Sequence, residues 1–158
     1  MAELDLSFNM EQGRFNYRVG AIIIHNNKLL MCKSHTANYY YSVGGRVRLN
    51  ESAEEAVIRE VYEEIGMQME IERLAYVNES FFVEEGAKER FHELSFFFFM
   101  KDMDELDTIS LSFIEDGVKE ELYWIPLEEL KRTHLYPDFF KEKLLIPSYG
   151  VEHILTRE

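Results

Sequence analysis

Three glutamates lie close together in the sequence at a spacing that could bind a metal ion. Glu60, Glu63 and Glu64 stand at positions i, i+3 and i+4, so on a helix they share one side. Like charges at this spacing repel each other, and a helix that keeps them together predicts a cation that neutralises them. Carboxylate oxygens are hard ligands and favour Mg²⁺ or Mn²⁺. For three glutamates considered alone, a solvated acidic face is the simpler alternative.

The segment that carries these glutamates has the signals of a helix. Ser52 is a good N-cap, and Glu55 follows at the position that a capping box requires. No glycine or proline occurs from Ala53 to Ile65, and Gly66 provides a stop signal. A separate apolar arc can face a core. This arc contains Val57, Ile58, Val61, Tyr62 and Ile65.

The residues before and within this helix follow a specific spacing. Gly45 is followed after five residues by Glu51, and after seven more by the segment Arg59–Met67. Every fixed position of the Nudix box is matched, so the chain resembles a Nudix hydrolase of the MutT-like kind. Val43 stands where the family usually has a proline before the Gly44-Gly45 pair, which leaves the backbone there less constrained.

The resemblance implies both a fold and a reaction. The fold is the α/β class, with the family's α/β/α sandwich of a mixed β-sheet between the box helix and a C-terminal helix. The reaction is hydrolysis of a pyrophosphate bond in a nucleoside diphosphate linked to another group, with Mg²⁺ or Mn²⁺ as the cofactor. A metal ion suits this chemistry because it lowers the pKa of bound water and withdraws charge from phosphoryl oxygens.

The predicted metal ligands come from the box. Glu60 and Glu64, one helical turn apart, are the primary ligands, and Glu63 either is a third ligand or orients water. By resemblance, the carbonyl of Gly44 is an additional ligand. These four residues are expected to meet in one cleft beside the glycine pair.

Two further box residues are expected to support the carboxylates. Glu51 precedes the helix and either binds the metal through water or holds Arg59. Arg59 lies four residues before Glu63 and can fix that carboxylate. A surface ion pair of little energetic weight is the alternative for Arg59.

The general base is not assigned by the box alone, because the family uses either a box glutamate or a carboxylate from a distal loop. Glu115, Glu120 and Glu121 are the candidates in the second half of the chain. Glu121 is favoured because it lies three residues before Trp124, where the family often has a glutamate. A solvated strand residue is the alternative for Glu121.

The substrate is left open by the sequence. Residues typical of the ADP-ribose, diadenosine polyphosphate and coenzyme A groups of the family are missing; Phe81, Phe82 and Val83 occupy the region where the first of these groups has a proline. A catalytically silent ligand-sensing or partner-binding module is the alternative function. The intact box glutamates favour the enzyme, and metal-dependent phosphate release would separate the two.

Length and composition set broader limits. The chain has 158 residues, of which 46% are hydrophobic, and we expect a single domain with a short polar lead-in over residues 1–13. A net charge of −13 disfavours broad binding to nucleic acid. No apolar run reaches the roughly 20 residues that span a membrane. With no signal-peptide pattern and Cys32 as the single cysteine, the cytoplasm is the expected location.

A small nucleotide-type substrate is therefore the expected partner, and a homodimer is left open. Hydrophobic patterns and turn residues predict the remaining elements. The expected strands are Phe15–His25, Lys28–Ser34, Gln68–Val83, Arg90–Met100 and Lys119–Ile125, with turns at 26–27 and 84–87. Because it contains four consecutive phenylalanines, the strand Arg90–Met100 is expected to be central. A long acidic loop over Lys101–Gly117, a short helix from Pro126 and a final helix over Tyr136–Ile146 complete the expectation.

Overall fold

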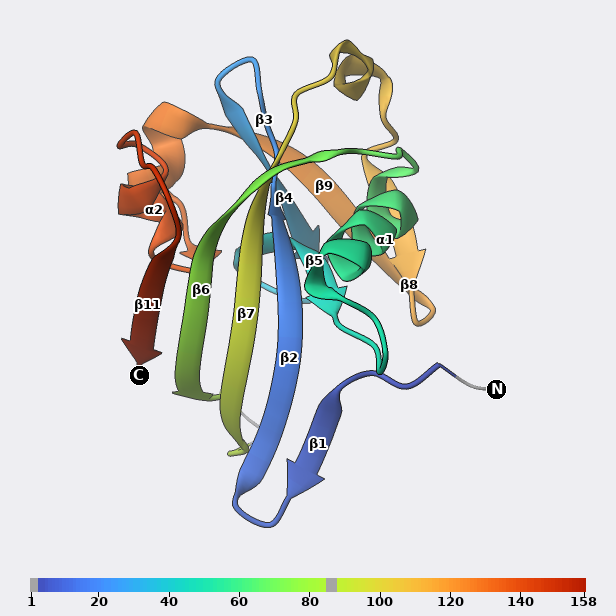
Figure 1. Ribbon diagram of the computed structural model, residues 1–158. Helices are drawn as coiled ribbons and strands as arrows, with labels where there is room; N and C mark the ends of the chain where they lie inside the picture. The colour runs from blue at the N-terminus through green and yellow to red at the C-terminus, as the bar shows by residue number, and fades with distance from the viewer. Residues whose placement is uncertain (1–2, 85–87) are drawn as a thin grey trace.

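The computed structural model describes residues 3–84 and 88–158 as a mixed β-sheet with a helix on each face (Figure 1). The strand order along the sheet is β11-β6-β7-β2-β5-β4-β9-β8. Short strands add to this path, since β1 pairs with β2, β3 with β4 and β10 with β5. The predicted α/β class with a mixed sheet between helices is therefore confirmed. No helix of the described ranges is long and apolar enough to cross a membrane.

Consecutive strands form antiparallel pairs along the chain, namely β1–β2, β3–β4, β4–β5, β6–β7 and β8–β9. The N-terminal strands are β1 (Ser7–Met10), β2 (Gly13–Ile22), β3 (Ile24–His25), β4 (Lys28–Ser34) and β5 (Tyr40–Arg46). The later strands are β6 (Ile71–Val83), β7 (Arg90–Met100), β8 (Ser112–Glu115), β9 (Val118–Pro126), β10 (Leu135–Tyr136) and β11 (Glu152–Arg157). The helices are α1 (Ala53–Ile65), η1 (Asp104–Thr108), η2 (Leu127–Arg132) and α2 (Phe140–Lys143), of which η1 and η2 are 3₁₀ helices.

The central position predicted for the phenylalanine-rich strand is confirmed. β7 pairs with β6 on one side and with β2 on the other. Successive side chains of a strand point to opposite faces, so Phe98 joins the core under α1 while Phe97 joins the core under α2. Both side chains are buried. A continuous apolar run is needed here because neither face of β7 is open to water.

The predicted box helix is confirmed in detail. The Ser52 hydroxyl accepts the N–H of Glu55, and the Glu55 carboxylate accepts the N–H of Ser52, which completes the capping box. Gly66 ends the helix in the left-handed conformation with φ 71°, which costs glycine little. The apolar arc faces the sheet, although Tyr62 lies largely exposed at its edge.

The C-terminal part of the chain differs from expectation. The helix predicted over Tyr136–Ile146 is wrong in its extent, because α2 has only four residues and Tyr136 belongs to β10. No strand was expected over Glu152–Arg157, where β11 pairs in parallel with β6 at the edge of the sheet. This strand depends on a partner far away in the sequence, so its local pattern carries little signal.

Smaller differences occur elsewhere. The lead-in expected over residues 1–13 contains β1, which forms a hairpin with β2. The acidic loop expected over Lys101–Gly117 contains η1 and β8. The turn predicted at Asn26-Asn27 is present, and both residues adopt positive φ. The turn predicted at 84–87 lies mostly outside the described residues.

Candidate active site

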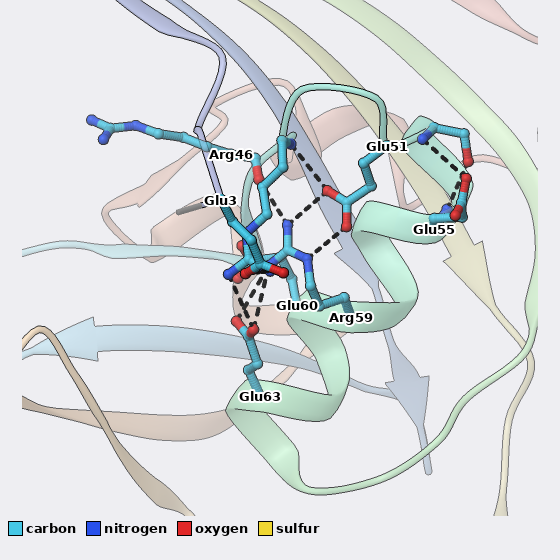
Figure 2. A network of polar contacts seen from close by, with 9 residues as sticks. Glu3, Arg46, Glu51, Glu55, Arg59, Glu60 and Glu63 are labelled. Carbon is cyan, nitrogen blue, oxygen red and sulfur yellow. Dashed lines mark hydrogen bonds and ion pairs between the residues drawn. The ribbon is translucent and has the colours of Figure 1, made fainter. Parts of the chain in front are cut away.

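Arg59 is the centre of the polar network around α1 (Figure 2). Its Nε and Nη2 donate to the two carboxylate oxygens of Glu51 at 2.7 and 2.9 Å. Nη2 also donates to the carbonyl of Arg46 at 3.0 Å. The Glu51 carboxylate in turn accepts the N–H of Arg48 at 3.0 Å. These contacts fasten the 46–51 loop to the helix, and a two-point guanidinium–carboxylate pair is among the strongest of such contacts.

The same guanidinium reaches two of the box carboxylates. Arg59 Nη1 lies 2.9 Å from Glu60 Oε1 and 3.4 Å from Glu63. Glu63 is largely exposed and also lies 3.7 Å from Arg48. The contacts of Glu51 and Arg59 hold the pKa of Glu51 below its usual range and raise the pKa of Arg59. Arg59 is therefore positively charged wherever the protein is folded.

Two box carboxylates are buried between α1 and the sheet. Glu60 and Glu64 are 6% and 4% exposed. Burial raises the pKa of both carboxyl groups, and the negative charge of Glu60 raises that of Glu64 further. Buried carboxylates cost folding free energy unless they are neutralised. Glu60 is paired with Arg59, whereas within the described residues Glu64 has only the N–H of Gly44, so packing alone does not explain why Glu64 is buried.

The glycine pair makes room for these carboxylates. A Cβ at Gly45 would lie 2.4 Å from the carboxyl carbon of Glu60, so only glycine lets α1 approach β5 this closely. The N–H of Gly44 donates to Glu64 Oε2 at 2.9 Å. Gly44 itself has φ 149°, and a Cβ there would meet the Val19 carbonyl at 2.1 Å. The glycines thus bring the β5 backbone against the two buried carboxylates.

The four predicted metal ligands come from two neighbouring elements, but they do not form a ready cluster. Among the described residues, no group of three or more His, Cys, Asp or Glu side chains is arranged to hold a metal ion. Glu60 contacts Arg59, Glu64 contacts Gly44, and Glu63 lies nearer the solvent. The donor chemistry nevertheless fits a hard divalent cation, because the carboxylate of Glu64 is almost fully buried and accepts a hydrogen bond from the N–H of Gly44, at 2.9 Å.

The candidates for the general base lie on different faces. Glu120 is buried on the α1 side and accepts a short hydrogen bond of 2.5 Å from the Tyr41 hydroxyl. Glu121 points the other way and accepts a hydrogen bond from Tyr123 at 2.6 Å. The structure therefore does not bring Glu121 to the box carboxylates.

Glu115, near the end of β8, lies close enough for its charge to raise the pKa of Glu64. Glu115 is exposed, but partial desolvation, together with the charges of Asp116 and Glu120, raises its pKa. Glu115 and Glu120 are thus the distal carboxylates on the α1 side. The strand period contained this information, since Glu120 lies two residues before the buried Leu122.

Sequence reasoning missed two further residues of this region. Tyr41 has no local sequence signal that marks it as a site residue, yet burial and the hydrogen bond to Glu120 raise the pKa of its hydroxyl well above the usual range. Arg18 on β2 was considered only as a strand residue. Its positive charge lowers the pKa of Glu64 and of Glu115, and only the spatial arrangement brings these groups together.

An α/β sandwich whose box helix buries glutamates against a glycine pair defines the class of protein. Comparison with known proteins agrees: the family model for the NUDIX domain matches residues 14–145. The chain therefore belongs to the NUDIX domain family, and its prediction as a Nudix pyrophosphohydrolase is confirmed at the level of the family. No curated protein matches the sequence.

Solved structures show the same fold. A MutT protein from Methanosarcina mazei Go1 is 23% identical with a TM-score of 0.63, over 84% of this chain and 91% of that chain. A MutT protein from Bacillus halodurans is 17% identical with a TM-score of 0.63, over 87% and 89%. An ADP-ribose pyrophosphatase from Streptococcus suis 89-1591 is 14% identical with a TM-score of 0.56, over 87% and 98%.

Proposed function

We propose that this chain is a divalent-metal-dependent hydrolase that cleaves the pyrophosphate bond of a nucleoside diphosphate linked to another group. The observation that carries the proposal is the pair of buried carboxylates, Glu60 and Glu64, packed against the backbone of Gly44 and Gly45. Two buried negative charges next to a glycine backbone serve no packing purpose, and they suit a cation that binds phosphate. The similar MutT proteins and the ADP-ribose pyrophosphatase support a substrate of this general class.

Each residue of the site then has a role. Glu60 and Glu64 hold Mg²⁺ or Mn²⁺ together with the Gly44 carbonyl, and Glu63 is a third ligand or orients the attacking water. When bound, the metal lowers the pKa of water and neutralises phosphoryl oxygens. For Glu60 to bind the ion, its carboxylate must share or give up its contact with Arg59.

Arg59 and Glu51 act as positioning residues. Their two-point contact joins the helix to the loop that follows the glycine pair. Arg59 also contacts Glu60 and Glu63 through the same nitrogen, Nη1, so it orients both carboxylates. Of the two roles considered for Glu51, holding Arg59 is the one that its contacts support.

The general base is best sought at Glu115 or Glu120, which lie on the α1 side, rather than at Glu121. Glu115→Gln, Glu120→Gln and Glu121→Gln separate the candidates. We expect turnover to fall by about 10²-fold or more in the variant that removes the base and to stay near wild type in Glu121→Gln. Loss of activity only in Glu121→Gln would return the base to the residue that the sequence favoured.

A substrate panel tests the function itself. Release of phosphate-containing products should be measured for nucleoside triphosphates, nucleotide sugars and dinucleotides, with Mg²⁺, with Mn²⁺ and with a chelator. We expect at least one compound to be cleaved and the chelator to abolish cleavage. Binding of a panel compound without turnover in either metal would instead favour the ligand-sensing module.

A further inference from the structure

Arg18, near the middle of β2, is a half-buried arginine without a partner. In residues 3–84 and 88–158, no hydrogen bond or ion pair holds its guanidinium, whereas every other half-buried arginine in those ranges has at least one. Those arginines are Arg14, Arg46, Arg48, Arg59 and Arg73. The chain has 30 acidic residues against 17 lysines and arginines. In such a sequence, an arginine left without a carboxylate is unexpected.

A second arginine makes the position less favourable still. Arg18 lies directly opposite Arg46 in the β2–β5 ladder and opposite Ser95 in the β2–β7 ladder. Directly opposite residues of neighbouring strands share a face, and like charges there are destabilising. Arg46 has only a distant contact, at 3.9 Å, with the partly exposed Asp5. Its side chain extends away from Arg59 and the box carboxylates (Figure 2). Arg18 thus presents unused donors opposite a second arginine whose ion pair with Asp5 is long.

This arginine pair lies one residue along each strand from Val19 and Gly45, which face α1. It therefore points to the opposite face of the sheet and is separated from the box carboxylates by the backbone of β5. Arg46 follows Gly45, whose backbone contacts the Glu60 carboxylate. β4 pairs with β5 at Tyr41 and Ser42, so the ladder between these strands stops before the glycine pair. The charge of Arg18 also acts on Glu64. An anion that spans from the carboxylates to the arginines would therefore run past the glycine pair.

We propose that Arg18, assisted by Arg46, is a substrate-binding residue that holds the phosphoryl oxygens not coordinated by the metal. This inference rests on the proposed function and names a further contact of the same substrate. Arginine donors match phosphate oxygens in two-point contacts. The charge of the metal is also shared with the carboxylates that bind it, so the two negative charges of a diphosphate linked to another group are not fully neutralised by the metal. A negatively charged ligand would then explain why Arg18 lies opposite another arginine and has no carboxylate partner.

The test compares the binding of an anion with the binding of a cation. The anion probe is methylenediphosphonate, a diphosphate analogue whose P–C–P link resists hydrolysis, titrated calorimetrically at saturating Mg²⁺. The cation probe is Mn²⁺ alone. In Arg18→Gln we expect the affinity for methylenediphosphonate to fall about tenfold or more. The affinity for Mn²⁺ should stay unchanged or rise, because a positive charge near Glu64 is gone. Arg18→Lys should lie between wild type and Arg18→Gln.

Arg132→Gln is the matched control. It removes the same charge from an exposed residue of η2 that pairs with Glu129, and both affinities should stay at wild-type values. Wild-type affinity for methylenediphosphonate in Arg18→Gln would overturn the proposal, and so would an equal loss of both ligands, since that would indicate a structural role. If no panel compound is hydrolysed but the probe still depends on Arg18, the proposed reaction fails while the anion site stands.

Discussion

The two faces of the sheet bury different kinds of side chain. On the α1 face, two glutamates are buried among aliphatic residues, and a network of arginine contacts surrounds them. On the α2 face, the core beneath Phe140 is built from aromatic and aliphatic side chains. Phe97 there contacts Phe139 and Phe140 with ring centroids 5.6 and 5.3 Å apart in edge-to-face geometry, which is the geometry that aromatic pairs prefer.

The difference indicates a division of labour. An apolar core lowers the free energy of the folded chain, whereas buried carboxylates raise it unless they are neutralised. The core beneath α2 therefore contributes stability, whereas the core under α1 gives up stability to position charge. Substitutions on the two faces should separate these contributions.

The largest effect is expected for Glu64→Gln on the α1 face. The substitution keeps the size of the side chain and removes one buried negative charge, so the variant should fold and should be as stable as wild type or slightly more so without metal. Turnover on a responsive panel substrate should fall by about 10²-fold or more, and added metal should restore it only in part. Kinetics at limiting and saturating Mg²⁺, with thermal melts, provide the measurement.

Glu54→Gln is the matched control for this prediction. Glu54 lies in the first turn of α1 and is exposed, so turnover should stay near wild type. Near wild-type turnover in Glu64→Gln at limiting metal would contradict the metal-site proposal.

The next largest effect is expected for Phe97→Ala on the α2 face. The substitution leaves a cavity among Phe139, Phe140 and neighbouring residues, and should lower the free energy of unfolding by about 3–5 kcal/mol. Because Phe97 lies away from the carboxylates, the folded fraction should keep its metal affinity. Denaturant unfolding and Mn²⁺ titration check the two parts. Phe8→Ala, at a residue 52% exposed, should cost far less; equal losses in the two variants would mean that the α2 face is not a core.

A smaller effect is expected at the helix start. Ser52→Ala removes the hydroxyl that accepts the N–H of Glu55 and should cost about 1 kcal/mol of stability. Ser52→Asp keeps a capping acceptor and should recover most of this loss. The result would separate stability from chemistry on the α1 face, because the N-cap stabilises α1 but does not contact the box carboxylates. A Ser52→Asp variant as unstable as Ser52→Ala would show that the cap is not the cause.

The sequence predicted best those parts that local interactions determine. α1 begins at a capping box and ends at Gly66, and both signals lie within the helix's own turns. The central strand was predictable since Phe96–Phe99 can be buried only between two layers. β11 was not predictable, because its pairing with β6 joins segments more than 70 residues apart.

The site was predictable only where the spacing of the box determined it. Glu121 was favoured over Glu120 because the family often has a glutamate at that position. The alternation of side chains along a strand places Glu120 on the same face as Leu122, and this was the better physical signal for which glutamate faces α1. The contact between Arg59 and Glu51 was one of two alternatives for Glu51, and this contact is present in the fold. Arg18 could be identified only from the structure, since the strand pairing places it opposite Arg46. Whether an arginine has a hydrogen-bond partner depends on the fold and cannot be read from the local sequence.

The smallest effect is expected at His25, a charged group that belongs to neither face's chemistry. Its Nδ1 lies 2.7 Å from Asp102 and its Nε2 2.8 Å from Asp107, and these hydrogen bonds, chiefly that of Asp107, raise the pKa of the imidazole. A raised pKa means that the contribution of the His25 contacts to stability is complete below the unfolded pKa of about 6.5 and disappears as the pH rises through the folded pKa.

Since Asp107 is 63% exposed, Asp107→Asn should cost less than about 1 kcal/mol of stability. Urea unfolding at about pH 6 and about pH 9 should show that this cost shrinks at the higher pH, whereas Asp104→Asn, in the same 3₁₀ helix, should show no such change. A cost of Asp107→Asn that is the same at both values would mean that the charge of His25 contributes nothing, and that buried charge matters only on the α1 face.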